Sequence, residues 1–314
     1  MLETVASAIS TPAIDKETSD AAKKRVIAEL TEKLSDPAYI ADQAAAKRLL
    51  GNFPYGRPIM GTPESLAVVD FADLRFIYDR MFGADNATLS ISGPFDRTQA
   101  FRAVRRYFGA WLKSDVKIPS TFTQPEQPPT VMISIDSPKP GSGEIRYAIR
   151  GLSRNDKDFA AAEIVARVVQ NRLRGKVPVD RRNLVSVRHN AHYLPGIMMF
   201  GLSEIVTKIK TEDGPEERIE ATDILFQALN NRITEAEFAA ARSAIVAERT
   251  KTPRETQWLD FETYNLASVR ADQAAFAAAT LPDIQRVADR VRSSTMVSVM
   301  VYSPQEASPE KVDQ

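Results

Sequence analysis

The sequence repeats itself: two stretches roughly 210 residues apart share the same spaced residues in the same order. The matching residues are Ala28-Glu29 with Ala247-Glu248, Pro37 with Pro253, Asp73-Leu74 with Asp283-Ile284, Asp79-Arg80 with Asp289-Arg290, and residues 88–92 with residues 297–301. Amphipathic helices can resemble one another by chance, but here order and spacing agree at several points. The sequence therefore predicts two copies of one unit, each ending in three helices and a strand.

A proline-rich stretch, residues 114–130, lies between the two copies. Proline removes amide donors and fixes φ, so this stretch is predicted to be an extended linker. We therefore expect a first domain over residues 1–113, a second domain over residues 131–303 and a polar tail over residues 304–314.

The part before the linker is predicted to be mostly helical. Apolar spacing predicts helices over residues 20–34, 37–50, 71–82 and 96–112. Residues 88–92 alternate polar and apolar side chains, which is typical of a half-buried strand. An isolated strand is not stable in water, so the first domain is expected to be incomplete. Either another chain supplies the missing strands, or this chain is a piece of a longer protein.

The part after the linker is predicted to hold a sheet and several helices. Strands are expected over residues 131–136, 144–150, 184–193, 196–203 and 296–302, and helices over residues 157–174, 215–231, 235–250, 254–270 and 282–292. Thr234 with Glu237 and Thr280 with Asp283 have the spacing of capping boxes, which predicts that helices begin there.

Composition excludes several classes of protein. The sequence has no cysteine, so it has neither disulfides nor thiolate ligands. Its 41 basic residues equal its 41 acidic ones, which argues against a nucleic-acid partner. No apolar run approaches the roughly 18 residues of a membrane span. Any histidine chemistry must use His189 or His192, the only two in the sequence.

An ordered set of short stretches resembles the insulinase/pitrilysin/mitochondrial-processing-peptidase family of inverted-motif zinc peptidases. The stretches are Asp36-Pro37-Ala38-Tyr39, Pro54-Tyr55-Gly56-Arg57-Pro58, Gly61-Thr62-Pro63-Glu64-Ser65, Asn86-Ala87-Thr88-Leu89, Ser92-Gly93-Pro94-Phe95-Asp96, Tyr107-Phe108-Gly109-Ala110-Trp111, Thr234-Glu235-Ala236-Glu237-Phe238 and Ala241-Arg242. The resemblance implies an α+β fold of duplicated peptidase-like domains, each a mostly antiparallel sheet with helices packed on it. It agrees with the internal repeat.

The zinc ligands of this family are absent from the sequence. The family motif, His-x-x-Glu-His on a helix, does not occur, and His189 and His192 are expected on a strand, where residues three apart point to opposite faces. We expect one packed and one exposed imidazole. The resemblance places Lys23 at the position of the family's distant glutamate ligand, and a lysine ammonium has no lone pair for zinc. Glu17 and Glu29 lie nearby if the alignment is off by a turn.

The resemblance also implies a substrate-binding arginine, which corresponds to Arg174 at the end of a predicted helix. The family's companion tyrosine corresponds to Val185, so half of the pair is absent. The alternative is that Arg174 is a helix-terminal cation favoured by the macrodipole.

Three functions follow as hypotheses. The first is a non-catalytic member or fragment of a zinc metallopeptidase-like protein that binds peptides or unfolded polypeptide, or that partners an active zinc-bearing chain in a homo- or heterodimer. The second is the C-terminal remainder of an active zinc metalloendopeptidase whose N-terminal third is missing. The third is a structural core subunit of a larger complex. This chain alone is predicted to be inactive and to hold no cofactor, although active relatives hold zinc. Because bacterial relatives are often exported, the resemblance favours a bacterial periplasmic or exported protein whose signal peptide is missing here.

Overall fold

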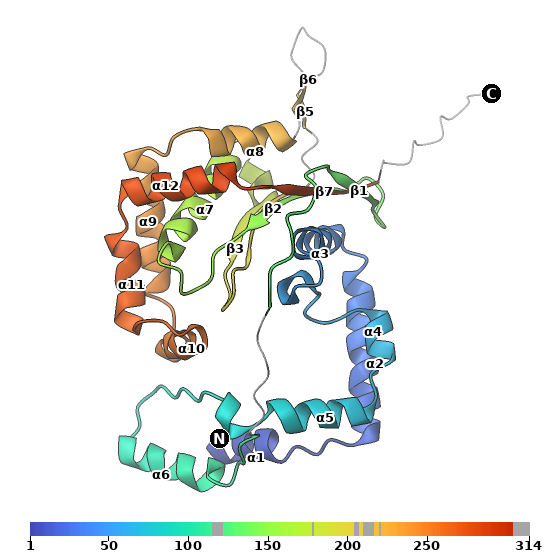
Figure 1. Ribbon diagram of the computed structural model, residues 1–314, viewed down its shortest axis with the longest axis vertical. Helices are drawn as coiled ribbons and strands as arrows, with labels where there is room; N and C mark the ends of the chain where they lie inside the picture. Colours follow the sequence, from blue (N-terminus) through green and yellow to red (C-terminus); the bar gives the residue numbers. More distant parts are fainter. Residues whose placement is uncertain (115–121, 178, 204–206, 210–216, 220, 304–314) are drawn as a thin grey trace, which may run out of the picture. The chain divides into compact units, whose positions relative to one another are not determined.

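The computed structural model describes residues 1–314 except 115–121, 178, 204–206, 210–216, 220 and 304–314 (Figure 1). It forms two compact units whose segments alternate along the chain. Unit 1 consists of Met1–Glu32, Met60–Phe122 and Pro253–Glu262, and unit 2 consists of Lys33–Ile59, Thr123–Thr252 and Thr263–Gln314. Each unit therefore takes segments from both sides of the proline-rich stretch.

Unit 2 is built on a five-stranded mixed sheet with the strand order β1-β7-β2-β4-β3. The strands are β1 (Ile133–Asp136), β2 (Gly143–Arg150), β3 (Val185–Asn190), β4 (Ile197–Ser203) and β7 (Val297–Tyr302). β1 runs parallel to β7, and the other pairs are antiparallel. These strands lie close to the predicted ranges, and the predicted α+β class is confirmed. A separate two-stranded hairpin joins β5 (Thr207–Ile209) to β6 (Glu217–Ile219).

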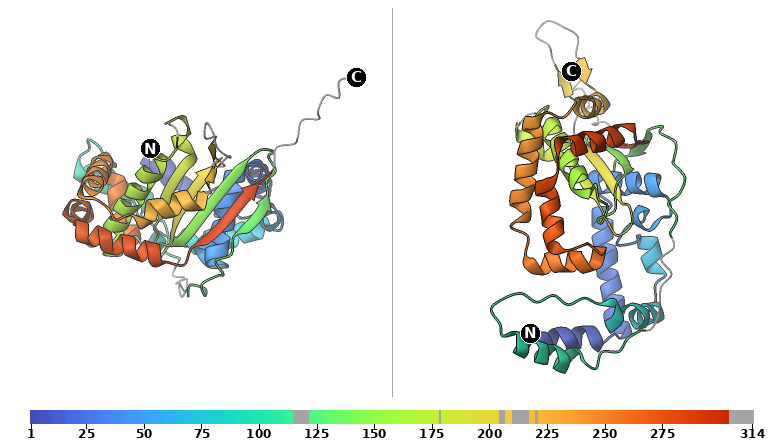
Figure 2. Two further views of the ribbon diagram at one scale, coloured as in Figure 1. Left: turned by 90° about the horizontal axis from the view of Figure 1, so that it is seen from above. Right: turned by 60° about the vertical axis from the view of Figure 1, so that its left-hand side comes forward.

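Helices cover both faces of this sheet (Figures 1 and 2). On the first face, α7 (Phe159–Arg174) lies against β3 and shares one core with α8 (Ala221–Asn230), α9 (Glu235–Arg249), α11 (Val269–Ala278) and α12 (Leu281–Ser293). Of these, α9 and α11 pack against α7. The opposite face packs against α3 (Pro37–Leu50). Because both faces are covered, β4 reads Ile-Met-Met-Phe-Gly-Leu with no polar alternation, as a strand buried on two sides should.

Local signals place most helix ends correctly. The capping boxes predicted at Thr234 and Thr280 are both formed, and each hydroxyl accepts the backbone N–H three residues later. The single helix expected over residues 254–270 is wrong. It is two helices, α10 (Arg254–Tyr264) and α11, because Asn265 adopts a left-handed φ of 51° and Ser268 caps the new helix. The helix expected over residues 215–231 begins only at Ala221, after β6.

Unit 1 is helical and has little core of its own. It contains α1 (Leu2–Ser10), most of α2 (Lys16–Lys33), α4 (Pro63–Ala67), α5 (Phe71–Met81), α6 (Arg97–Phe108) and most of α10. Of its described apolar side chains, only Ala6 and Leu30 are fully buried. α1 was not predicted.

The strand predicted over residues 88–92 does not form. The sequence lacks strands to pair with this segment, and an unpaired strand gains no ladder hydrogen bonds. Its Leu89 side chain is 47% exposed. Among the described helices of the whole chain, none is long and apolar enough to cross a membrane.

Candidate functional site

His189 is a structural residue of unit 2. It lies on β3 with a side chain that is 0% exposed. Its Nδ1 lies 2.9 Å from Oε1 of Glu163 on α7, and its Nε2 accepts the backbone N–H of Leu152 at 3.0 Å. Since a donor points at Nε2, the proton is on Nδ1 and is donated to the carboxylate. Both ring nitrogens are therefore used within the chain, and neither offers a lone pair to a metal.

The backbone passes very close to the His189 ring. A Cβ added to Gly151 would lie 2.9 Å from Cδ2 of His189. Only glycine leaves room for the chain to turn here and present the Leu152 N–H to the imidazole.

His192 lies beyond the end of β3, in the loop before β4, and not on the strand as predicted. Its ring is tilted against Tyr55 with centroids 4.4 Å apart. Burial lowers the pKa of the His192 imidazole, and His189 lowers it further, so the ring is uncharged at neutral pH. The ring is half-buried, whereas we expected an exposed one.

The described residues do not fit the zinc site of active relatives. Nowhere in the described ranges do three histidine, aspartate or glutamate side chains gather closely enough to hold a metal ion. Lys23, which the sequence resemblance was expected to align with the family's glutamate ligand, lies on α2 in unit 1, and its Nζ donates to the Val69 carbonyl at 2.9 Å. An ammonium that caps a carbonyl cannot act as a ligand.

Two arginines at the end of α7 have different surroundings. Arg172 is saturated: its Nε and Nη2 donate to the two carboxylate oxygens of Glu237 at 2.6 and 2.7 Å, and its Nη1 donates to the Ala228 and Asn231 carbonyls. Arg174, the residue singled out by sequence, has no hydrogen bond to the described part of the chain, and its Nε is buried without a partner there. The guanidinium of Arg172 is thus structural, whereas the Arg174 side chain makes no such contacts with the described residues.

The described five-stranded sheet has two edge strands, β1 and β3, and β3 is the one that lies beside α7. β3 pairs with β4 on one side, and no described strand pairs with it on the other. Val185, the residue expected from the resemblance to correspond to the family's tyrosine, starts β3 and is buried in the core. It cannot act as a polar substrate contact.

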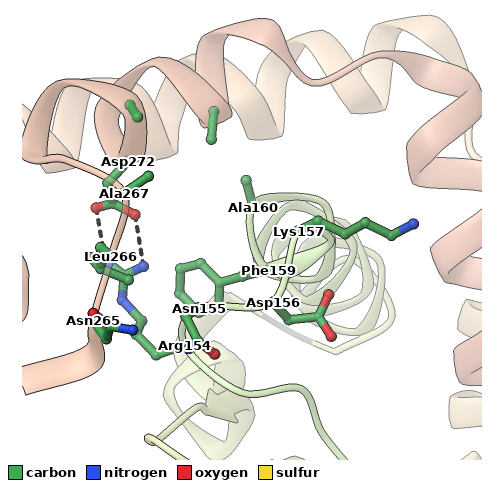
Figure 3. Close-up of a pocket in the computed structure, with 12 residues that line it drawn as sticks. Arg154, Asn155, Asp156, Lys157, Phe159, Ala160, Asn265, Leu266, Ala267 and Asp272 are labelled. Carbon is green, nitrogen blue, oxygen red and sulfur yellow. Dashed lines mark hydrogen bonds and ion pairs between the residues drawn. The ribbon is translucent and has the colours of Figure 1, made fainter.

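A cavity of about 390 Å³ opens between the loop of residues 154–157, the first turn of α7 and the turn before α11 (Figure 3). Arg154 is 6% exposed and donates to both carboxylate oxygens of Asp272 at 2.7 Å. Its guanidinium stacks on Phe159, 4.3 Å from the ring centroid, and Arg249 donates to the same carboxylate. The cavity lining includes no histidine, serine, threonine or tyrosine. Arg154 therefore holds the loop of residues 154–157 against α11. The cavity lining offers no nucleophile with an adjacent base.

A partly buried ionic network joins α3 to the sheet. Asp42 on α3 accepts hydrogen bonds from Nε of Arg146 and Nη2 of Arg188, both at 2.6 Å. The Arg146 side chain is 4% exposed and also donates to Glu144, which accepts the Ser203 hydroxyl at 2.6 Å. Every charge in this network has a partner, so its role is structural.

Comparison with known proteins identifies the family. Residues 69–245 match the model of the peptidase M16 inactive domain, which is more than half of the chain. The chain therefore belongs to this family, and the predicted resemblance to zinc peptidases is confirmed. An uncharacterized zinc protease of Mycobacterium leprae is 26% identical over 87 residues, which is 28% of this chain and 20% of that protein.

Solved structures share the fold at low identity. A peptidase M16 inactive domain from Pseudomonas fluorescens has a TM-score of 0.78 at 18% identity, with 98% of this chain matching 74% of that one. A protease from Helicobacter pylori has a TM-score of 0.79 at 14% identity, with 96% of this chain matching 75% of that one. This chain thus spans about a fifth of the curated relative and about three quarters of these solved chains.

Two further similar structures are complexes. A chain of complex III2 from Candida albicans has a TM-score of 0.72 at 15% identity, covering 96% of this chain and 75% of that one. The ferredoxin protease FusC in complex with Arabidopsis ferredoxin has a TM-score of 0.55 at 17% identity, covering 100% of this chain and 37% of that one.

Proposed function

We propose that this chain is a non-catalytic M16 protein that binds extended peptides or unfolded polypeptide along the free edge of β3. The observation that carries the proposal is the outer edge of β3, which has no described neighbour. Such an edge offers a row of backbone donors and acceptors to which a peptide adds as a further strand. The bound ferredoxin of the similar FusC structure supports a protein or peptide as the ligand.

Arg174 is the proposed substrate-binding side chain. It ends α7, which packs on β3, and its guanidinium has no hydrogen bond to the described residues. A guanidinium with free donors binds a peptide carbonyl or carboxylate.

Peptide binding is tested by fluorescence anisotropy with a labelled, unfolded casein peptide, together with hydrogen exchange of the chain. The peptide should slow exchange of the β3 amides, residues 185–190. Arg174→Gln should weaken binding by roughly tenfold, the loss of one charge-assisted contact. Lys176→Gln, a neighbouring cation at the same helix end, is the control. Equal binding by both variants, or unchanged β3 exchange, would refute this assignment.

In proteolysis, we propose that the chain acts beside an active zinc-bearing homologue rather than alone. The alternative is that the chain is the C-terminal remainder of an active metalloendopeptidase. One experiment distinguishes the two functions. The purified chain is assayed for bound zinc and for cleavage of a quenched fluorescent peptide. Stoichiometric zinc with chelator-sensitive cleavage by this chain alone would exclude the non-catalytic function.

A structural core subunit is the second candidate, favoured by the similarity to a chain of Candida albicans complex III2. Co-purification with a large assembly, without peptide binding, would support it. Export to a bacterial periplasm remains a prediction that cell fractionation tests.

A further inference from the structure

A second cavity of unit 2, of about 400 Å³, lies on the face of the sheet that shares its core with α7 and α12. It is lined from the sheet by Tyr147 of β2 and Ser298 of β7, which stand directly opposite each other in the antiparallel pair. Its walls come from Met132, just before β1, from Phe226 on α8, and from residues 292–296, where α12 leads into β7 (Figure 1). The cavity therefore lies toward the β1 edge of the sheet.

Ser298 brings a buried hydroxyl to this cavity. The residue is 7% exposed, and its hydroxyl makes no hydrogen bond to the described part of the chain. A buried hydroxyl without a partner costs free energy, because it has lost its hydrogen bonds to water. By contrast, the hydroxyls of Ser293 and Ser294 in the same lining both donate to the Arg290 carbonyl. Ser298 thus offers a donor and an acceptor to a polar atom of a ligand.

Arg292 gives the cavity a positive charge. Among the described residues that line it, Arg292 is the only charged one. Its guanidinium donates to the Asn230 carbonyl at 3.1 Å and to the carboxylate of Asp289. Its remaining N–H groups make no hydrogen bond to described residues. A carboxylate on a ligand would therefore find both a cation and hydrogen-bond donors here.

The apolar part of the lining favours an aromatic ring. Met132 and Met296 contribute thioethers, which make favourable contacts with aromatic rings. Phe226 lines the same cavity, and aromatic rings attract one another in edge-to-face and offset arrangements. Phe226 and Met132 are 45 and 39% exposed, so a ring packed against them would remove apolar surface from water.

We propose that this cavity binds an aromatic carboxylate. The ring packs against Phe226 and the two methionines, and the carboxylate is bound by Arg292 and Ser298. Two sources share this chemistry: a free small acid and the C-terminal aromatic residue of a peptide. Either fits, because ligand pockets typically measure roughly 300–1,000 Å³. β3 is the opposite edge strand of the sheet, so the inference does not depend on peptide binding there.

Isothermal titration calorimetry of the 314-residue chain tests the chemistry of the ligand. The probes are phenylpropionate and N-acetyl-glycyl-phenylalanine, each compared with its neutral amide. At least one acid should bind roughly tenfold more tightly than its amide, the effect of one charge-assisted hydrogen bond. The acid that binds more tightly identifies the source. Absence of binding at millimolar concentrations, or equal binding of acids and amides, would overturn the proposal.

A matched pair of variants locates the site. Arg292→Gln should weaken binding of the acid by roughly tenfold and abolish its advantage over the amide. Arg290→Gln removes the other cation in the last turn of α12 and should leave the affinity unchanged. Ser298→Ala should weaken binding of the acid by roughly fivefold, the loss of one hydrogen bond. Binding that neither Arg292→Gln nor Ser298→Ala changes would overturn this site.

Nuclear magnetic resonance locates the site without any variant. The acid should shift the amide signals of residues 292–298 in the wild-type chain. Shifts confined to other parts of the chain would overturn the assignment to this cavity.

Discussion

The ion pair between Arg172 and Glu237 makes a pH-dependent contribution to stability that can be measured. Hydrogen bonds from Arg172 lower the pKa of the Glu237 carboxyl from 4.5 to about 2. A shift of this size corresponds to about 3 kcal/mol at roughly 1.4 kcal/mol per pH unit. Because the Glu237 side chain is 33% exposed, screening by water reduces this to about 1–2 kcal/mol.

The sign follows from linkage. The folded pKa is depressed, so the stabilisation is complete above pH 4.5 and is lost as the pH falls toward 2. Glu237→Gln removes the charge, and glutamine still completes a capping box with Thr234. The variant should therefore be less stable than wild type at pH 7, and the difference should narrow as the pH falls below 4.5.

The assay is urea unfolding followed by circular dichroism, at several pH values between 7 and 3, on both proteins. Other carboxylates titrate in the same range, but they are common to both proteins and cancel in the difference. A difference in the free energy of unfolding that stays constant from pH 7 to pH 3, or that is absent at pH 7, would refute the reasoning.

Two further predictions concern the packing of unit 2, and both are read as Tm by calorimetry. Gly151→Ala should lower the free energy of unfolding by about 1–3 kcal/mol, because the added Cβ would press on the His189 ring. Gly143→Ala is the control: its Cβ would lie 3.6 Å from the nearest atom, an ordinary contact, so its loss of stability should be clearly smaller. Asp42→Asn should lower the free energy of unfolding by about 2–4 kcal/mol, because it weakens the pairing of the buried Arg146 guanidinium. A loss of stability below about 0.5 kcal/mol would mean that the ionic network does not hold α3 on the sheet.

Several helix ends were predictable because their cause lies within a few residues. The helix starts at Thr234 and Thr280 are examples, because a cap needs only a hydroxyl and a carboxylate three positions later. The break at Asn265 was missed, although its signal was present: an asparagine that tolerates left-handed φ, followed by Ser268 as a cap. The apolar spacing continues across residues 254–270, so it predicted one unbroken helix there.

Long-range arrangement was not predictable from spacing. One contact that positions α3 is the hydrogen-bonded ion pair between Asp42 and Arg146, which are 104 positions apart in the sequence. No local sequence pattern predicts this pair. Likewise, the tautomer of His189 follows from the Leu152 N–H, which a separate loop brings to the Nε2 atom of the ring. The sequence left the role of His189 open, and its tertiary contacts with Glu163 and the Leu152 N–H define a structural one.

The two arginines at the end of α7, Arg172 and Arg174, differ in their hydrogen bonds although the sequence gives both the same charge. Both carry the charge that the helix macrodipole favours at a C-terminus, so this effect alone does not distinguish them. Arg172 uses its donors on Glu237 and on carbonyls at the end of α8 and beyond, and a substrate could engage it only by breaking those bonds. Arg174 has no such bonds to the described residues. A ligand contact would therefore cost Arg174 less, which supports its assignment to peptide binding over Arg172.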